Sequence, residues 1–235
     1  MNDRPRLVLN VSNCVAGGGR QIAIWFAAKL LAEQGRLAYD ISFVVNEKHS
    51  PELDLPPDET LVLRASPLRS ASARKQIRQF LSRRRCDLVF SLFGPSGFSH
   101  PRQIGGVANA FITSLDPGLF RQIFPSTWPM QFLRYFLYGR MLARLNALVF
   151  ETEGERWRFA ARHLYPHERT YVVPNSIHET FISAEPQPSG KVDCIDGPRL
   201  LFVTSIQRHK NNHMLPAYVE ALRAAGLERF RSEEH

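Results

Sequence analysis

Apolar residues recur along the chain in short continuous runs, separated by stretches with helical spacing. Residues 7–11 and 41–45 are continuous runs rich in β-branched side chains. Residues 21–34 instead carry apolar side chains every three to four positions, and Gly35 follows them. Continuous runs are typical of strands buried on both faces, and the wider spacing is typical of helices. The opening of the chain therefore predicts a strand, a glycine-bearing loop, a helix and a second strand.

The same alternation continues to residue 173. We expect further strands at 61–63, 87–92, 107–114, 148–150 and 170–173, and helices at 72–85, 130–145 and 153–164. Alternating strands and helices predict a parallel sheet covered on both faces, which is a Rossmann-like α/β domain. Ligands bind such sheets at the carboxyl ends of the strands, so the polar residues that follow each strand are candidate site residues.

The last of these strands stops at Pro174 and Asn175, which we interpret as an interdomain hinge. The N-terminal domain would span residues 1–174, and residues 175–197 would be the hinge and linker. Residues 198–235 predict one strand and one helix, at 199–204 and 215–225. A single strand–helix unit cannot bury both faces of its strand. We therefore expect 198–235 to be an incomplete second Rossmann-like domain.

The composition of the chain bears on where in the cell the protein works. The 235 residues are 44% hydrophobic, and no apolar run approaches the roughly 18 residues that cross a bilayer. The first residues lack the pattern of a signal peptide. Three cysteines, Cys14, Cys86 and Cys194, are far apart and odd in number, which disfavours both a disulfide framework and a zinc site. We expect a cytoplasmic protein without a metal.

The net charge of +8 favours anionic partners, such as a nucleotide or phospholipid head groups. Residues 130–145 mix aromatic side chains with arginines, and residues 72–85 form a basic helix. Such helices suit peripheral contact with an anionic inner membrane face. An ordinary amphipathic helix with a solvated basic face explains the pattern slightly better. No recognised motif supports nucleic-acid binding, and we expect none.

Three glycines, Gly17, Gly18 and Gly19, stand between the first strand and the first helix. Glycines allow close backbone approach, and a helix start offers free N–H groups to an anion or to sugar hydroxyls. A tight turn that needs positive φ explains them equally well. The spacing does not match G-x-G-x-x-G, and no Walker lysine follows, so a dinucleotide or P-loop fingerprint is not satisfied.

Two further polar groups are candidates for chemistry. Arg208 and Lys210 follow the strand expected at 199–204 and could neutralise a departing pyrophosphate, although an isolated basic loop is more often simply solvated. Asp116 follows the strand expected at 107–114 and could orient an acceptor hydroxyl or act as a base. Capping a turn is the commoner role of an aspartate before Pro-Gly.

The remaining titratable groups favour structural roles. We expect four histidines to lie at the surface: His49, His100, His163 and His167. Cys14 lies beside the glycine loop but has no evident histidine partner, so a small buried filler is the better interpretation than a nucleophile.

Together these residues resemble the retaining GT-B glycosyltransferases, the "group 1" family that uses nucleotide-sugars. Val172-Val173-Pro174-Asn175-Ser176-Ile177-His178 with Phe181 resembles the family's hinge, usually V-I-P-N-G-V-D followed by F. Leu201-Phe202-Val203 with Lys210-Asn211 resembles the strand that opens its donor domain and the lysine loop after it. The triple glycine resembles its acceptor-side loop, and residues 148–153 with Thr152 resemble a short strand ending near a serine. The likeness runs along nearly the whole chain.

The resemblance implies two Rossmann-like domains that face a cleft. The N-terminal domain would hold a glycan or lipid-linked acceptor, with Gly17, Gly18 and Gly19 lining the cleft. The C-terminal domain would hold a nucleotide-sugar, with Lys210 on the donor diphosphate and Asn175 shaping the hinge. The implied reaction transfers a hexose to a lipid-linked or polysaccharide acceptor, with no metal or other cofactor.

The chain departs from the family's pattern at three places. Thr204-Ser205 replaces the usual glycine-arginine after the donor strand, and Leu115 replaces a frequent histidine before Asp116. The E-x7-E segment and most of the donor domain have no counterpart, which predicts a truncated chain with little transfer activity of its own. The alternative is a non-catalytic acceptor- or membrane-binding module, or a subunit completed by a second chain. A Rossmann oxidoreductase is a third hypothesis, weakened by the missing fingerprint.

Overall fold

A computed structural model describes residues 4–174 and 215–226 of the chain. The strands are β1 (Arg6–Asn10), β2 (Asp40–Asn46), β3 (Thr60–Leu63), β4 (Leu88–Ser91), β5 (Gln103–Val107), β6 (Ala147–Phe150) and β7 (Thr170–Val172). The α-helices are α1 (Gly17–Ala32), α2 (Ala71–Arg83), α3 (Ala110–Ser114), α4 (Pro117–Ile123), α5 (Trp128–Leu142), α6 (Glu153–His163) and α8 (Leu215–Ala224).

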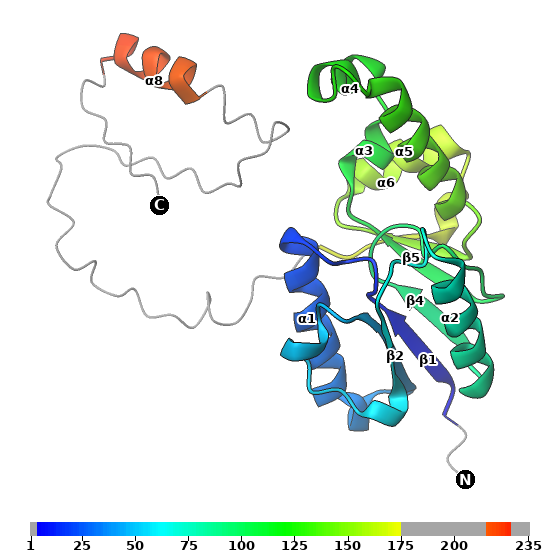
Figure 1. The fold of residues 1–235 in the computed structure, drawn as a ribbon. Helices are drawn as coiled ribbons and strands as arrows, with labels where there is room; N and C mark the ends of the chain where they lie inside the picture. Colours follow the sequence, from blue (N-terminus) through cyan, green and yellow to red (C-terminus); the bar gives the residue numbers. More distant parts are fainter. Residues whose placement is uncertain (1–3, 175–214, 227–235) are drawn as a thin grey trace, which may run out of the picture.

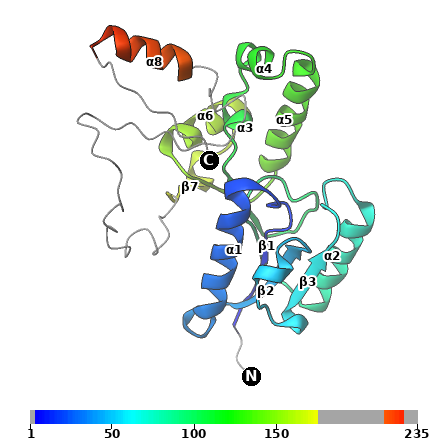
Figure 2. The same cartoon turned by 60° about the vertical axis from the view of Figure 1, so that its left-hand side comes forward.

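All seven strands form one parallel sheet in the order β3-β2-β1-β4-β5-β6-β7. Helices lie on both sides of the strands, with α1 and α2 on opposite sides (Figures 1 and 2). The predicted Rossmann-like α/β fold is thereby confirmed. The chain winds outward from β1 toward β3 and then returns to add β4 on the other side of β1. The strand order reverses between β1 and β4, and ligands of such folds bind at this reversal.

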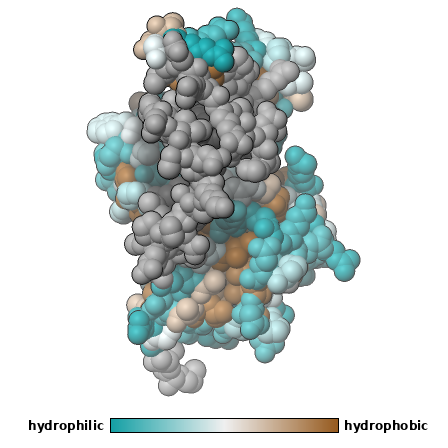
Figure 3. Space-filling view, turned by 90° about the vertical axis from the view of Figure 1, so that its left-hand side faces the viewer, coloured by the Kyte–Doolittle hydropathy of each residue, from teal (hydrophilic) through white to brown (hydrophobic). Residues whose placement is uncertain are grey.

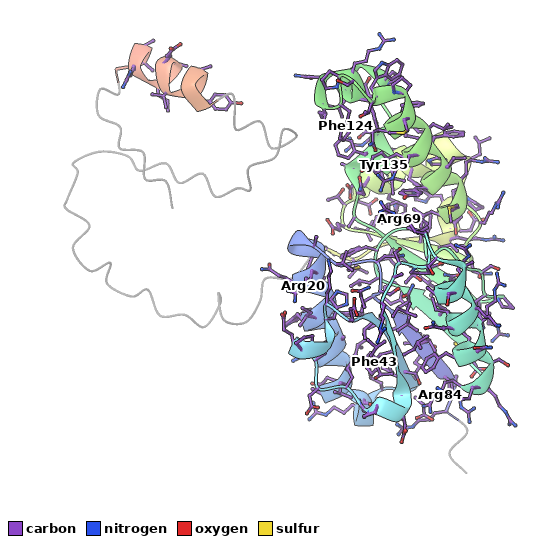
Figure 4. All side chains as sticks on the ribbon, viewed as in Figure 1. Arg20, Phe43, Arg69, Arg84, Phe124 and Tyr135 are labelled. Atoms are coloured by element: carbon purple, nitrogen blue, oxygen red, sulfur yellow. The ribbon has the colours of Figure 1, made fainter. Side chains whose placement is uncertain are left out.

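The core is divided by the sheet, because successive side chains of a strand point to opposite faces. Leu9 of β1 packs with Phe43 and with Ala23 and Ala27 of α1. Val8, its neighbour, packs on the other face with residues of α2. Figure 4 shows Phe43 among the side chains of the core. Figure 3 looks onto the side that α1 covers, where hydrophobic surface lies between hydrophilic groups.

A separate aromatic cluster holds α3, α4 and α5 together beyond the strand ends. The ring centroid of Phe111 lies 5.5 Å from those of Phe120 and Phe124, and 5.3 Å from that of Tyr135. Phe124 and Tyr135 are labelled in Figure 4. Aromatic pairs at such separations stabilise packing beyond the effect of buried area.

The strand expected at 107–114 is wrong. Strand β5 ends at Val107, and residues 110–114 form the short helix α3. Asn109 starts this helix, because its side-chain oxygen accepts a hydrogen bond from the backbone N–H of Phe111 at 2.9 Å. Most of β5 therefore lies before residue 107, where Gly105 and Gly106 gave little apolar signal.

The other predicted elements lie within a few residues of their expected positions, whereas helix α4 was not predicted. The first helix begins earlier than expected, at Gly17, so the triple glycine forms its first turn. Thr152 caps α6, with its hydroxyl oxygen accepting the N–H of Glu155 at 3.2 Å. The helix expected at 215–225 is confirmed as α8, and Gly226 follows it with φ of +91°. The linker and the strand expected at 199–204 lie outside the described residues.

None of the helices in residues 4–174 and 215–226 combines the length and apolarity that crossing a bilayer requires.

Candidate functional site

The candidate site lies at the carboxyl edge of the sheet, between the ends of β1 and β4. The connection from β1 to α1 spans residues 11–16, and the loop after β4 spans residues 92–102. Because all strands are parallel, both connections leave the sheet at the same edge. The triple glycine follows the first of them, as the sequence predicts.

The glycine turn opens α1 without any capping side chain. Ala16 occupies the N-cap position in extended conformation, and the first turn carries no acidic residue. The backbone of Gly17 has φ of +60°, which confirms that a tight turn needs glycine there. No atom lies within 4 Å of where a Cβ would stand on Gly17 or Gly18. The first turn of a 16-residue helix therefore borders open space, and the free N–H groups of a helix start suit an anion or a hydroxyl oxygen.

A buried polar network fastens the two connections to the sheet. The Asn10 side chain donates a hydrogen bond to the Ser91 hydroxyl at 3.2 Å, joining the ends of β1 and β4. Its carbonyl oxygen accepts both the N–H and the hydroxyl of Ser12, at 3.2 and 2.7 Å. Gln103 of β5 donates to the Ser96 hydroxyl at 2.7 Å. All five side chains are buried, and this pairing lowers the cost of burying them.

Asn13 links three connections at once. Its amide nitrogen donates to the carbonyl oxygen of Pro95 at 2.8 Å, after β4. Its amide oxygen accepts the hydroxyl of Ser66 at 2.8 Å, after β3. The residue is partly buried, so these bonds set the position of the β1–α1 connection relative to its neighbours.

His49 holds the same connection from the β2 side, and its predicted surface position is wrong. The ring is fully buried. The backbone N–H of Asn46 donates to Nδ1 at 3.2 Å, so Nδ1 is an acceptor and Nε2 carries the proton. Nε2 then donates to the carbonyl oxygen of Cys14 at 2.7 Å. In this tautomer the His49 ring links the end of β2 to the β1–α1 connection through one hydrogen bond to each.

Cys14 is a buried filler, as expected. Burial raises the pKa of its thiol to about 12, and a hydrogen bond with the backbone of Phe93 offsets only part of that effect. The thiolate is the nucleophilic form of cysteine, and it is scarce at neutral pH when the pKa is so high. The structure therefore gives Cys14 no nucleophilic role.

Asp116 lies outside this network, because it follows α3 and not a strand as expected. It is the exposed N-cap of α4, and its Oδ1 accepts the N–H of Gly118 at 2.8 Å. The capping role is thus confirmed. No described contact joins Asp116 to the glycine turn.

Of the remaining predicted site residues, only Pro174 belongs to the described part of the chain. Pro174 is exposed, directly after Val173, whose N–H donates to the carbonyl of Phe150 at 2.9 Å. Asn175, Arg208 and Lys210 lie outside the described residues. Within residues 4–174 and 215–226, no three His, Cys, Asp or Glu side chains gather closely enough to hold a metal ion.

Close backbone contacts fix the loop after β4. Gly97 has φ of +75°, and a Cβ there would lie 2.7 Å from the carbonyl carbon of Pro67. At Gly106 a Cβ would overlap the carbonyl oxygen of Leu92, and the Gly106 carbonyl accepts the N–H of Gly94 at 2.9 Å. These glycines allow the loop to press against its neighbours.

His163 of α6 is also buried, again contrary to the surface position expected from sequence. Its ring lies against Gly139 of α5 and 4.4 Å from the Phe159 ring, centroid to centroid. Neither ring nitrogen has a hydrogen-bond partner among the described residues. Burial lowers its pKa below 6.5; the backbone of Ile112 partly offsets this, while the positive charges of Arg162 and Arg140 add to it.

We expect this histidine to make the fold less stable in mild acid. Near pH 6.5 His163 becomes protonated in the unfolded chain but stays unprotonated in the folded chain. The free energy of unfolding is therefore highest above that pH and falls as the pH drops toward the lowered pKa of the folded state. The slope from one proton is at most about 1.4 kcal/mol per pH unit. Urea unfolding at several pH values should show a flatter profile for both His163→Leu and His163→Gln. Equal slopes in wild type and both variants would contradict the assignment.

No protein-family model matches the chain, and no curated protein matches it.

Proposed function

We propose that this chain carries the acceptor-side domain of a retaining GT-B glycosyltransferase together with the beginning of its donor domain. The reaction would transfer a hexose from a nucleotide-sugar to a lipid-linked or polysaccharide acceptor. One observation carries the proposal: the uncapped glycine turn that opens α1 at the reversal of the strand order. Support comes from the resemblance of residues 172–181 and 201–211 to the family's hinge and lysine loop.

In this proposal each part of the reaction has a physical counterpart. The N–H groups of Gly17, Gly18 and Gly19 would bind hydroxyl or phosphate oxygens in the cleft. Lys210 with Arg208 would stabilise the nucleoside diphosphate as its bond to the sugar breaks, since negative charge grows on the leaving group. Asp116 would orient an acceptor hydroxyl with Oδ2, because its cap uses Oδ1.

The test is transfer of labelled hexose from a panel of nucleotide-sugars into lipid and polysaccharide fractions. Gly18→Asp should lower turnover at least about tenfold, because its carboxylate would occupy the open turn and repel an anion. The fold should survive, since the position is exposed and a helix start favours acidic residues. Gly35→Asp is the matched control, because Gly35 is also exposed with no atom near its would-be Cβ.

Equal loss in the two variants would contradict a role for the glycine turn.

The second candidate function is a non-catalytic acceptor-binding module, or a subunit completed by another chain. Thr204-Ser205, which stands where the family usually has glycine-arginine after the donor strand, favours it. Acceptor binding that Gly18→Asp abolishes, without turnover for any donor, would support that candidate over the enzyme.

A further inference from the structure

One face of α5 presents large apolar side chains to solvent. Met130, Leu133 and Leu137 are 62%, 56% and 50% exposed, and their spacing places them along one side of the helix. A groove of about 460 Å³ runs beside them, bounded by the β3–α2 connection, by Arg74 of α2 and by Gly97. Exposed apolar residues gathered in this way mark an interaction surface more often than single ones do.

Arginines border the same groove. Its lining includes Arg69, Arg74 and Arg134 and no acidic side chain. In Figure 4, Arg69 lies at the end of α2 nearest to α5. Arg134 donates from Nε to the Tyr138 hydroxyl at 3.1 Å, and Arg74 donates to the Pro67 carbonyl at 2.8 Å. Each guanidinium has five N–H donors, so most donors of both residues remain for an anion.

The segment of the chain that supplies this groove is more basic than the chain as a whole. Residues 60–150 contain thirteen Lys or Arg and two acidic residues, Asp87 and Asp116, although the whole chain carries +8. Asp87 binds the backbone N–H of Arg6, and Asp116 caps α4. Within the described part of the chain, no ion pair neutralises the three groove arginines.

We propose that this face, formed by Met130, Leu133, Leu137, Arg69, Arg74 and Arg134, docks on an anionic lipid bilayer. The three apolar side chains would enter the interface, and the arginines would bind lipid phosphates. Helix α5 would lie along the surface, because its 15 residues extend about 22 Å and a bilayer core is about 30 Å thick. The proposal goes beyond glycosyl transfer and does not rest on it.

Other occupants of this face fit less well. A second copy that packed by the same face would bring the three arginines against three like charges, which disfavours the contact. Nucleic acid would use the arginines, but single strands bind through stacked aromatic rings and not through methionine and leucine. A bilayer satisfies the cations and the aliphatic side chains together.

Vesicle co-sedimentation of the full chain tests the proposal. Wild type should bind vesicles of phosphatidylcholine with 30% phosphatidylglycerol, at about 0.1 M salt, and bind pure phosphatidylcholine far less. Arg69→Gln with Arg134→Gln should weaken binding about 25-fold, since one basic residue near the surface contributes about fivefold. Met130→Gln/Leu133→Gln/Leu137→Gln should abolish sedimentation and keep the helical circular dichroism.

The matched control removes the same charge elsewhere. Arg83→Gln with Arg85→Gln changes two exposed residues at the other end of α2 and should retain binding within about threefold. A loss as large as that of the groove pair would overturn the proposal and indicate a general charge effect. Absence of sedimentation by wild type, or binding to single-stranded nucleic acid that survives the apolar triple variant, would overturn it as well.

Discussion

Replacing Gly106 by alanine is expected to lower the free energy of unfolding by about 3 kcal/mol or more. The added Cβ would overlap the carbonyl oxygen of Leu92, which belongs to the backbone and cannot rotate away. Relief requires β5 to move from β4, and that movement breaks the bond from the Gly94 N–H to the Gly106 carbonyl. Urea unfolding followed by circular dichroism measures the loss.

Gly105→Ala is the matched control for this prediction. A Cβ at Gly105 would lie 2.6 Å from Cδ1 of Leu145, which is the flexible end of a side chain. Leu145 can change rotamer, so the expected cost is about 1 kcal/mol or less. Two adjacent glycines of one strand should thus differ clearly, and equal losses would show that the Leu92 carbonyl does not limit the site.

Gly139→Ala is expected to destabilise the protein by about 1–3 kcal/mol, against the usual trend for helices. In a helix interior, alanine ordinarily exceeds glycine by about 1 kcal/mol. Here the new methyl group would overlap the ring of His163, which already fills the space between α5 and α6.

A double-mutant cycle makes this prediction sharp. In a His163→Ala background the ring is gone, and Gly139→Ala should then stabilise the protein by about 1 kcal/mol. The effect of one substitution therefore changes sign with the other, with a coupling of about 2 kcal/mol or more. Unfolding curves for the four proteins measure it, and additive effects would refute direct contact between the two sites.

The sequence predicts most of the sheet because buried parallel strands consist mainly of apolar residues. Strands β1, β2 and β4 each contain such a run, and all were located within two residues at either end. Strand β5 was misplaced because Gly105 and Gly106 lack the side chains on which a hydrophobic pattern depends. These glycines are needed because they leave space for the Leu92 carbonyl and for Leu145. Such contacts arise only in the folded chain, so a local sequence pattern does not reveal them.

The sequence predicts where the candidate site lies, but it predicts few of the side-chain contacts within it. The glycines stand beside each other in sequence, so their place between strand and helix could be predicted. Asn10 and Ser91 are 81 positions apart and meet only when β1 and β4 pair. The only sequence feature that pointed to this contact was the presence of a polar residue within each of the two apolar runs. The burial of His49 could not be predicted, because its partners come from the ends of two strands.

The strand order also determines when each strand can pair during synthesis of the chain. Strand β1 pairs with β2 on one side, but its other neighbour is β4, with Leu7 opposite Leu88. At about 5–20 residues per second, a ribosome needs about 4–16 s to make the intervening segment. Throughout that interval β1, an interior strand of the finished sheet, keeps the N–H and C=O groups of one edge unpaired. A strand that is paired on both sides in the finished sheet is therefore open at one edge while the chain is made, and a chaperone that binds extended segments could occupy that edge.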